Sequence, residues 1–148
     1  MSTASDITAT RIVRLNEEGF RGQLYDDETG RLVHAPVGKA TIGYGMNCES
    51  GISEPVARAI LALQLNEFEG QLLQRPWYAG CDDVRRSALL ELAFNEGMSG
   101  FINGFPKLIA AVGAEDWPDA EAECTVKNEN VKPRYVRIGQ ILLSGIDA

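Results

Sequence analysis

The fold is decided by residues 16–45, which read NEEGFRGQLYDDETGRLVHAPVGKATIGYG. A helical pattern ends near Glu18, and Gly19 is the residue type on which helices commonly stop. Beyond it, short apolar pieces alternate with turn residues, a pattern typical of a small antiparallel sheet. The segment therefore places two carboxylates, Glu18 and Asp27, and the hydroxyl of Thr41 around a helix end and a β-hairpin.

The rest of the chain carries helical patterns. The longest begins after the capping hydroxyl of Ser53, has Pro55 in its first turn and is stopped by Pro76. Further helices are expected over residues 8–18 with Ser5 or Asp6 as N-cap, from a cap at Asp82 or Asp83 to just before Gly97, and over about 106–112, 116–127 and 133–143.

This order of helix, small sheet, long helix and helical bundle predicts an α+β fold in one domain, residues 1–148. A sheet-bearing lobe is expected at about 20–50 and a larger helical lobe at about 76–148, which also takes in the N-terminal helix. The long helix would join the two lobes. A cleft between such lobes is the usual place for a ligand.

Composition and charge exclude several classes of function. The formal net charge is −7 and the arginines are scattered, so the sequence lacks the basic face that nucleic-acid binding needs. His34 is the only histidine, and the three cysteines, Cys48, Cys81 and Cys124, lie far apart, which favours free thiols over a disulfide framework or a zinc site. We therefore expect neither a metal nor a cofactor.

The sequence also carries no targeting or membrane signal. No apolar run approaches the roughly 20 residues that span a bilayer. Residues 1–6 lack the basic and apolar regions of a signal peptide. We expect synthesis in a cytosol and no insertion into a membrane.

Glu18 and Asp27 are candidates for acid–base chemistry. The carbonyl groups at a helix end disfavour ionisation of a nearby carboxylate, which would suit Glu18 as a general acid. Two carboxyl groups, one protonated and one ionised, are the minimum equipment for cleaving a glycosidic bond. Plainer interpretations exist, because aspartates in a turn such as that of Asp27 often bond to their own backbone and Thr41 is an ordinary strand residue.

Three motifs resemble, in this order, those of the phage-type lysozymes, the muramidase endolysins of glycoside hydrolase family 24: EGFR at 18–21, YDD at 25–27 and TIGYG at 41–45. Two regions downstream are similar as well. DVRRSA at 83–88 and FNEG at 94–97 resemble the helix on the far side of the family's cleft, and PRYVR at 133–137 with SG at 144–145 resembles its C-terminal helix. The resemblance covers nearly the whole chain.

The resemblance implies a catalytic set of Glu18, Asp27 and Thr41. It implies cleavage of the β-1,4 bond between N-acetylmuramic acid and N-acetylglucosamine in peptidoglycan. In this interpretation Glu18 donates a proton to the glycosidic oxygen, while Asp27 and Thr41 hold a water on the opposite face of the sugar, which gives inversion. A lysozyme-like fold with its active site in the cleft between the lobes is expected.

Other residues receive supporting roles from the same resemblance. Arg134 matches an arginine that in the family pairs with the catalytic glutamate. Asn95 matches a polar residue of the cleft, and Tyr25 and Phe94 are expected to bind substrate beside it. The partner implied is bacterial cell-wall peptidoglycan. We expect a monomer that leaves the host cytoplasm, for example through a holin, and acts in the periplasm.

The spacing of Asp27 and Thr41 departs from the family's familiar form, because more residues lie between them. We expect residues 30–39 to form a longer hairpin that loops outward at the rim of the cleft and contacts the glycan or its peptide stems. Their proline, glycines and single histidine suit an exposed turn.

Three other functions fit parts of the sequence. A lytic transglycosylase needs only the acid glutamate and forms an anhydro sugar. A catalytically inactive lysozyme fold could serve as a wall-binding part of a virion, although an intact set of Glu18, Asp27 and Thr41 speaks against it. A helical interaction domain would explain the helices but not the carboxylates of the hairpin.

Overall fold

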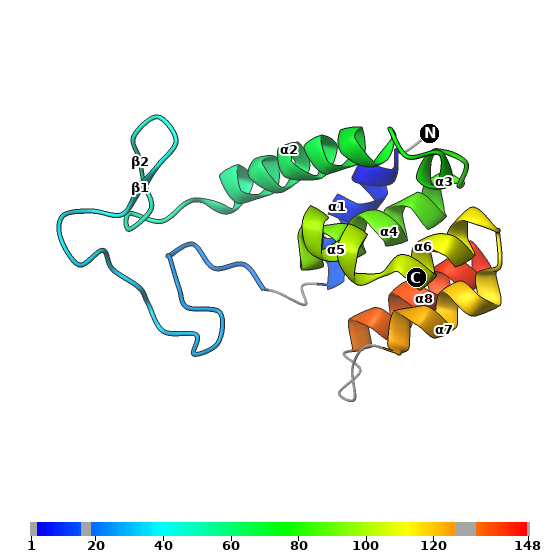
Figure 1. Cartoon of the computed structure of the whole chain (residues 1–148). Coiled ribbons are helices and arrows are strands. Elements are labelled where there is room, and N and C mark those ends of the chain that lie inside the picture. The colour runs from blue at the N-terminus through cyan, green and yellow to red at the C-terminus, as the bar shows by residue number, and fades with distance from the viewer. Residues whose placement is uncertain (1–2, 16–18, 127–132, 148) are drawn as a thin grey trace.

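The computed structural model describes residues 3–15, 19–126 and 133–147. These residues form helices and one two-stranded antiparallel sheet (Figure 1), so the prediction of an α+β, lysozyme-like fold is confirmed. In chain order the elements are α1 (Ala4–Leu15), β1 (Thr41–Ile42), β2 (Met46–Asn47), α2 (Glu54–Leu72), α3 (Pro76–Ala79), α4 (Asp83–Glu96), α5 (Met98–Gly104), α6 (Pro106–Gly113), α7 (Trp117–Thr125) and α8 (Pro133–Ser144).

Helix α1 begins four residues earlier than the sequence suggested, at Ala4 instead of Thr8. Thr3 and Asp6 cap it reciprocally: the Asp6 N–H donates to Thr3 Oγ1 and the Thr3 N–H donates to Asp6 Oδ2, both at 3.2 Å. The prediction that Ser5 or Asp6 is the N-cap was therefore wrong, since both lie inside the helix. The predicted helix end at Glu18 lies outside the described residues, and Gly19 just beyond it has a φ of +69°.

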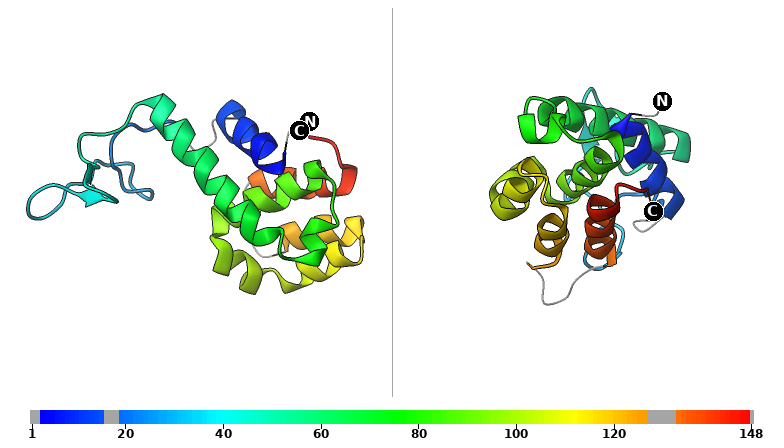
Figure 2. Two further views of the ribbon diagram at one scale, coloured as in Figure 1. Left: turned by 90° about the horizontal axis from the view of Figure 1, so that it is seen from above. Right: turned by 90° about the vertical axis from the view of Figure 1, so that its right-hand side faces the viewer.

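Helix α2 is the predicted long helix, and its 19 residues span about 28 Å. Its N-cap is Ser53, as expected, although the Ser53 side chain makes no capping hydrogen bond. The helix ends at Leu72, and Pro76 opens the short helix α3 instead of directly ending α2. Figures 1 and 2 show α2 running from the loops that carry the sheet to the body of packed helices.

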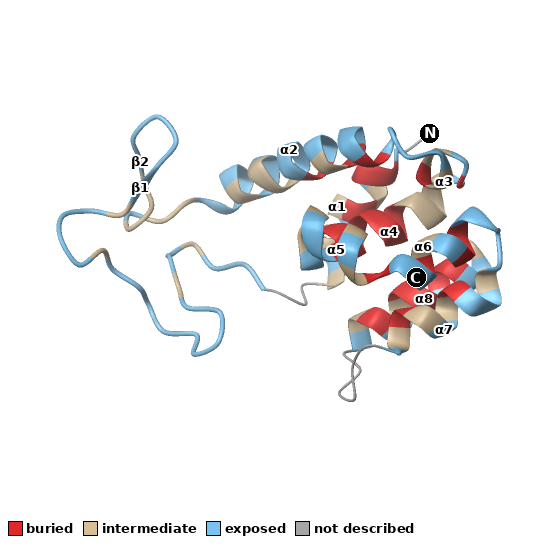
Figure 3. Ribbon diagram, viewed as in Figure 1, coloured by how far each residue is buried: buried red, intermediate tan, exposed pale blue. Residues whose placement is uncertain are grey.

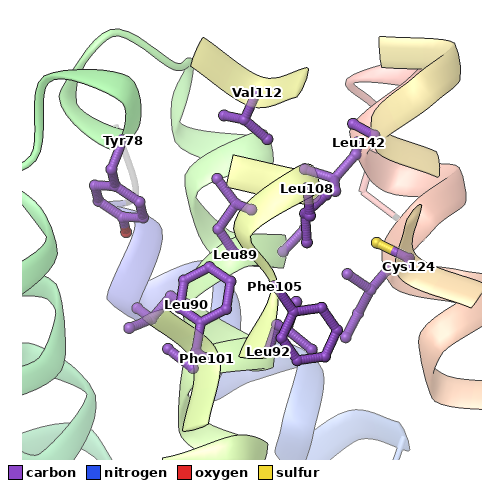
Figure 4. Packing of buried hydrophobic residues seen from close by; sticks show 14 of the residues in the cluster. Tyr78, Leu89, Leu90, Leu92, Phe101, Phe105, Leu108, Val112, Cys124 and Leu142 are labelled. Atoms are coloured by element: carbon purple, nitrogen blue, oxygen red, sulfur yellow. The ribbon is translucent and has the colours of Figure 1, made fainter. Parts of the chain in front are cut away.

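Helix α4 is the centre of that body, where α1, α2, α5 and α8 all pack against it. Its N-cap is Asp82, whose side chain accepts the Arg85 N–H at 2.9 Å, and Gly97 ends it with a φ of +74°. All residues from Ser87 to Ala93 are buried. The core gathers around them in Figures 3 and 4, with Leu89, Leu90, Leu92, Phe101, Phe105, Leu108, Val112 and Leu142 among its members.

The C-terminal helices agree with the sequence except for α5, which was not predicted. Helix α5 contains Gly100 and Gly104, which lower its helix propensity, so local signals do not indicate it. Its buried residue Phe101 packs on Trp77 and Phe105, with ring centroids 6.0 and 6.1 Å away. Tertiary packing therefore stabilises this helix.

The segment from residue 19 to 53 lies on one side of the molecule (Figures 1 and 2), and we call it the small lobe. A bridge joins Tyr25 to Leu32, and β1 pairs with β2 in the register Thr41 to Asn47 and Ile42 to Met46. The strand at β2 was not predicted. Many large apolar side chains of the lobe are exposed: Phe20, Leu24, Leu32, Val33, Val37, Ile42, Tyr44 and Met46.

Cys48, Cys81 and Cys124 are free thiols, and the latter two are buried. Within residues 3–15, 19–126 and 133–147, no group of histidine, cysteine and acidic residues could hold a metal ion. None of the helices in these ranges is long and apolar enough to cross a membrane.

Candidate active site

The expected site residues come from two parts of the chain, because Tyr25, Asp27 and Thr41 lie in the small lobe, whereas Phe94 and Asn95 lie in α4 and Arg134 lies in α8. Glu18, the expected acid, lies outside the described residues, between the end of α1 and Gly19. A cavity of about 140 Å³ lies beside Gly19, where Ile12 of α1 and Phe20 meet Ala57 and Leu61 of α2. The charged side chains of Glu54 and Arg58 line the same cavity, so apolar and charged groups both lie near Gly19.

Asp27 lies in the turn of the first hairpin, but its neighbour Asp26 holds that turn together. Asp26 Oδ1 accepts the N–H groups of Glu28 and Thr29 at 3.0 and 2.9 Å and the Thr29 hydroxyl at 3.2 Å. These bonds, chiefly the one from the Thr29 N–H, lower the pKa of Asp26. Within the described chain, Asp27 makes no side-chain hydrogen bond or ion pair, so the plainer role of a turn-capping aspartate belongs to Asp26.

Thr41 is the first residue of β1, and its side chain is already oriented by its own backbone. The Thr41 hydroxyl donates to the carbonyl oxygen of Lys39 at 3.0 Å. While its single proton is used there, the oxygen is left as an acceptor for a water. Asp27 and Thr41 therefore both present acceptors from successive hairpins of the small lobe.

Residues 30–39, the expected rim, are largely exposed and are tied down by Glu49, a residue that sequence reasoning missed. Glu49 Oε1 accepts the Ala35 N–H at 2.6 Å, and Lys39 Nζ lies 3.5 Å from Oε2. The Ala35 N–H is the main cause that lowers the pKa of Glu49. Between these anchors Val37 is 90% exposed, which agrees with an outward loop; its contact with glycan stays a prediction.

Asn95 and Arg134 form a pair between α4 and α8. Arg134 Nη1 donates to Asn95 Oδ1 at 2.9 Å. Asn95 is half-buried, and its Nδ2 atom is buried without a hydrogen-bond partner in the described structure. The expected partner of Arg134, Glu18, lies outside the described residues.

The two aromatic candidates have clear neighbours. The ring of Tyr25 lies under the guanidinium of Arg21, whose Cζ is 4.5 Å from the ring centroid. Phe94 packs edge-on against Phe68, with centroids 6.3 Å apart, at the margin of the core. A substrate contact for either ring stays a prediction.

A buried ionic network behind Asn95 was not foreseen from the sequence. Glu91 of α4 lies between Arg11 of α1 and Arg137 of α8, each within 3.0 Å of its carboxylate. Two patterns could have revealed it. Glu91 interrupts an apolar run in α4, and Arg11 falls on the buried stripe of α1 that also holds Ala4 and Thr8.

Comparison with known proteins assigns the chain to a family. No curated protein matches the sequence. The sequence model of the family described as phage lysozyme matches residues 15–137, which include every residue expected at the site. Since this match covers most of the chain, the protein belongs to the phage lysozyme family, whose members are glycosidases that hydrolyse peptidoglycan.

Proposed function

We propose that the protein is an endolysin muramidase that cleaves the β-1,4 bond between N-acetylmuramic acid and N-acetylglucosamine, with Glu18, Asp27 and Thr41 as its catalytic residues. The observation that carries this proposal is the family match over residues 15–137, together with the retention of all three residue types within it. The hydrogen bonds of the turn support the proposal as well. They go to Asp26, so the carboxylate of Asp27 stays available for chemistry.

The proposed reaction inverts the anomeric centre. Glu18 donates its proton to the glycosidic oxygen as the bond breaks, and a water attacks from the opposite face. The water donates its two protons to Asp27 and to the oxygen of Thr41, so that a lone pair faces the sugar. The hydrogen bond from Thr41 to Lys39 supports this role, since it leaves the hydroxyl oxygen as an acceptor.

Arg134 and Asn95 would set the electrostatics around the acid. A guanidinium beside Glu18 would favour the ionised carboxylate, whereas a nearby helix end or burial would favour the protonated acid. Asn95 holds one nitrogen of Arg134 at 2.9 Å, which supports a fixed position for the cation. An acid that must stay protonated near neutrality needs such a balance.

The biological setting of the proposal is lysis of a bacterial host. The protein would be made in the host cytoplasm as a monomer and would reach peptidoglycan in the periplasm after release, for example through a holin. Residues Tyr25, Phe94 and Asn95 would contact the glycan, and the exposed segment 30–39 would meet it at the rim.

Product analysis on purified peptidoglycan tests the proposal. The expected product has a free reducing end at N-acetylmuramic acid, and proton NMR taken before mutarotation shows the α-anomer. Anhydromuramic acid would instead identify a lytic transglycosylase. Binding of peptidoglycan without turnover would identify a catalytically inactive fold.

A further inference from the structure

Glu91 carries a buried charge that no step of the proposed reaction uses. Its side chain is 2% exposed and lies in α4 between the core residues Leu90 and Leu92. Oε2 accepts from Arg11 Nη1 at 2.9 Å. Arg137 forks onto the same carboxylate, with Nη1 3.0 Å from Oε2 and Nη2 2.7 Å from Oε1. One carboxylate thus joins cations from α1 and α8.

Arg11 has a second acidic partner, Asp147, near the C-terminus. Arg11 Nε donates to Asp147 Oδ1 at 2.8 Å, and its Nη2 donates to Ser87 Oγ at 2.6 Å. The side chain of Asp147 is 42% exposed, whereas that of Arg11 is fully buried. Of the two carboxylates that contact Arg11, Glu91 is buried and also contacts α8 through Arg137, whereas Asp147 is partly exposed.

Two further pairs of side chains join α4 to α8. Further along α4, Asn95 accepts from Arg134, and Glu96 accepts a close hydrogen bond from the hydroxyl of Tyr135. Together with the Glu91 pair these make three contacts, which we call the α4–α8 seam. Its acceptors lie in the last six residues of α4 and its donors in the first five of α8.

The α4–α8 seam restrains Arg134, the residue that is proposed to lie beside the acid Glu18. Arg134 and Arg137 are three positions apart and lie on the same side of α8, so the fork on Glu91 restrains the turn that carries Arg134. Helix α1, which Arg11 holds to the same carboxylate, precedes Glu18 by three residues in the sequence. Displacements of about 1 Å at catalytic groups can reduce rates by about two orders of magnitude.

We infer that Glu91 is a positioning residue for the proposed hydrolysis, which acts by locking α1 and α8 onto α4 through Arg11 and Arg137. The inference rests on the proposed function, and it assigns Glu91 no contact with substrate. Its consequence is that loss of the Glu91 charge affects the chemical step more than substrate binding.

The substitution Glu91→Gln tests this with little change of shape. The amide presents an NH₂ group where Arg137 needs an acceptor, so the two-pronged pairing is lost. We expect kcat on peptidoglycan to fall at least about tenfold, with KM within about twofold, at a temperature where circular dichroism shows a folded protein. Asp147→Asn is the matched control, since it removes the other carboxylate from Arg11 and should leave kcat within about twofold.

A second variant and a second measurement complete the test. Arg137→Met removes the contact of α8 with Glu91, while Arg11 still neutralises that carboxylate. This variant replaces Glu91→Gln in the test if Glu91→Gln does not fold. The same loss of kcat is expected. In the variant that folds, hydrogen exchange of the backbone amides at 137–141, the first N–H groups of α8 that are bonded within the helix, should become faster than in the parent and in Asp147→Asn.

The outcomes separate this inference from the proposed function. Parental kcat in a folded Glu91→Gln or Arg137→Met variant overturns the inference. Equal losses in Glu91→Gln and Asp147→Asn also overturn it, because the effect would then follow from stability alone. A parent enzyme without activity on peptidoglycan overturns the proposed function, and the positioning role with it.

Discussion

Asp26 accepts the backbone N–H of Thr29 at 2.9 Å, whereas the adjacent carboxylate of Asp27 takes no part in this turn. Two neighbouring aspartates thus have separable roles, one in the fold of the hairpin and one available for chemistry. Substituting each by asparagine makes a matched pair with the same change of charge.

Asp27→Asn should abolish activity without altering stability, because it removes the carboxylate proposed to polarise the water. Asp26→Asn keeps an oxygen that can accept the same turn bonds, so most activity should remain. Peptidoglycan turnover and thermal unfolding of both variants check this. Equal activities in the two would show that Asp27 does not hold the water.

Glu18→Gln should lower kcat by about 10² to 10⁴, which is the usual contribution of general acid catalysis. Glu17→Gln removes the same charge one residue away and should keep most of the activity. Rates of solubilisation of labelled peptidoglycan, with unfolding curves for both proteins, give the comparison. Near-parental cleavage by Glu18→Gln would exclude this residue as the acid.

Thr41→Ala should lose less activity than Asp27→Ala, since the hydroxyl only helps to place the water while the carboxylate also polarises it. Thr41→Ser restores the oxygen and should recover most of the loss. The measurement is kcat for the three variants under one set of conditions. Equal and mild effects at both positions would mean that the long hairpin has moved this pair away from the water.

Replacing residues 34–38 with an Asn-Gly turn should keep the fold and change KM or the preference among walls. The segment is exposed and is held mainly through the bond from Ala35 to Glu49. Glu49→Gln in the full-length protein is the control, because it weakens the anchor without shortening the rim. Kinetics that do not change on peptidoglycan from several species would show that the rim has no role in binding.

Arg85→Lys should destabilise the protein by about 2 kcal/mol while leaving kcat unchanged. Arg85 Nε donates to the Leu142 carbonyl oxygen at 2.7 Å, and Arg85 Cζ lies 4.2 Å from the ring centroid of Trp117. The side chain therefore caps the C-terminal end of α8 and packs on α7. The exposed pair of Arg58 and Glu54 supplies the control, since Arg58→Lys should cost less than about 0.5 kcal/mol. Urea unfolding measures both.

The sequence predicted those elements whose ends are set by local chemistry. Asp82 and Asp116 cap α4 and α7 with their own side chains, and Pro106 begins α6, so short-range patterns were sufficient. Helix α5 was missed because Phe101 stabilises it through distant rings. The start of α1 was misplaced because the reciprocal cap of Thr3 precedes the expected one.

For the candidate site, the motifs indicated residue types but not their partners. That Asn95 accepts from Arg134 depends on how α4 and α8 cross, which no spacing within either helix specifies. The network around Glu91 joins helices at opposite ends of the chain, so its assembly depends on tertiary packing. The role of Asp26 was locally determined, yet the sequence alone did not distinguish it from Asp27.

The placement of the three thiols gives the protein a ready site for spectroscopic labelling. Burial raises the pKa of Cys81 to about 11 and that of Cys124 to about 12, and since the thiolate is the reactive form, both resist alkylation at neutral pH. Cys48 of the small lobe is only half-buried. A maleimide dye or spin label would attach there selectively, and paired with a probe on the helical body it would report whether the distance between the lobe and the body changes when glycan is added.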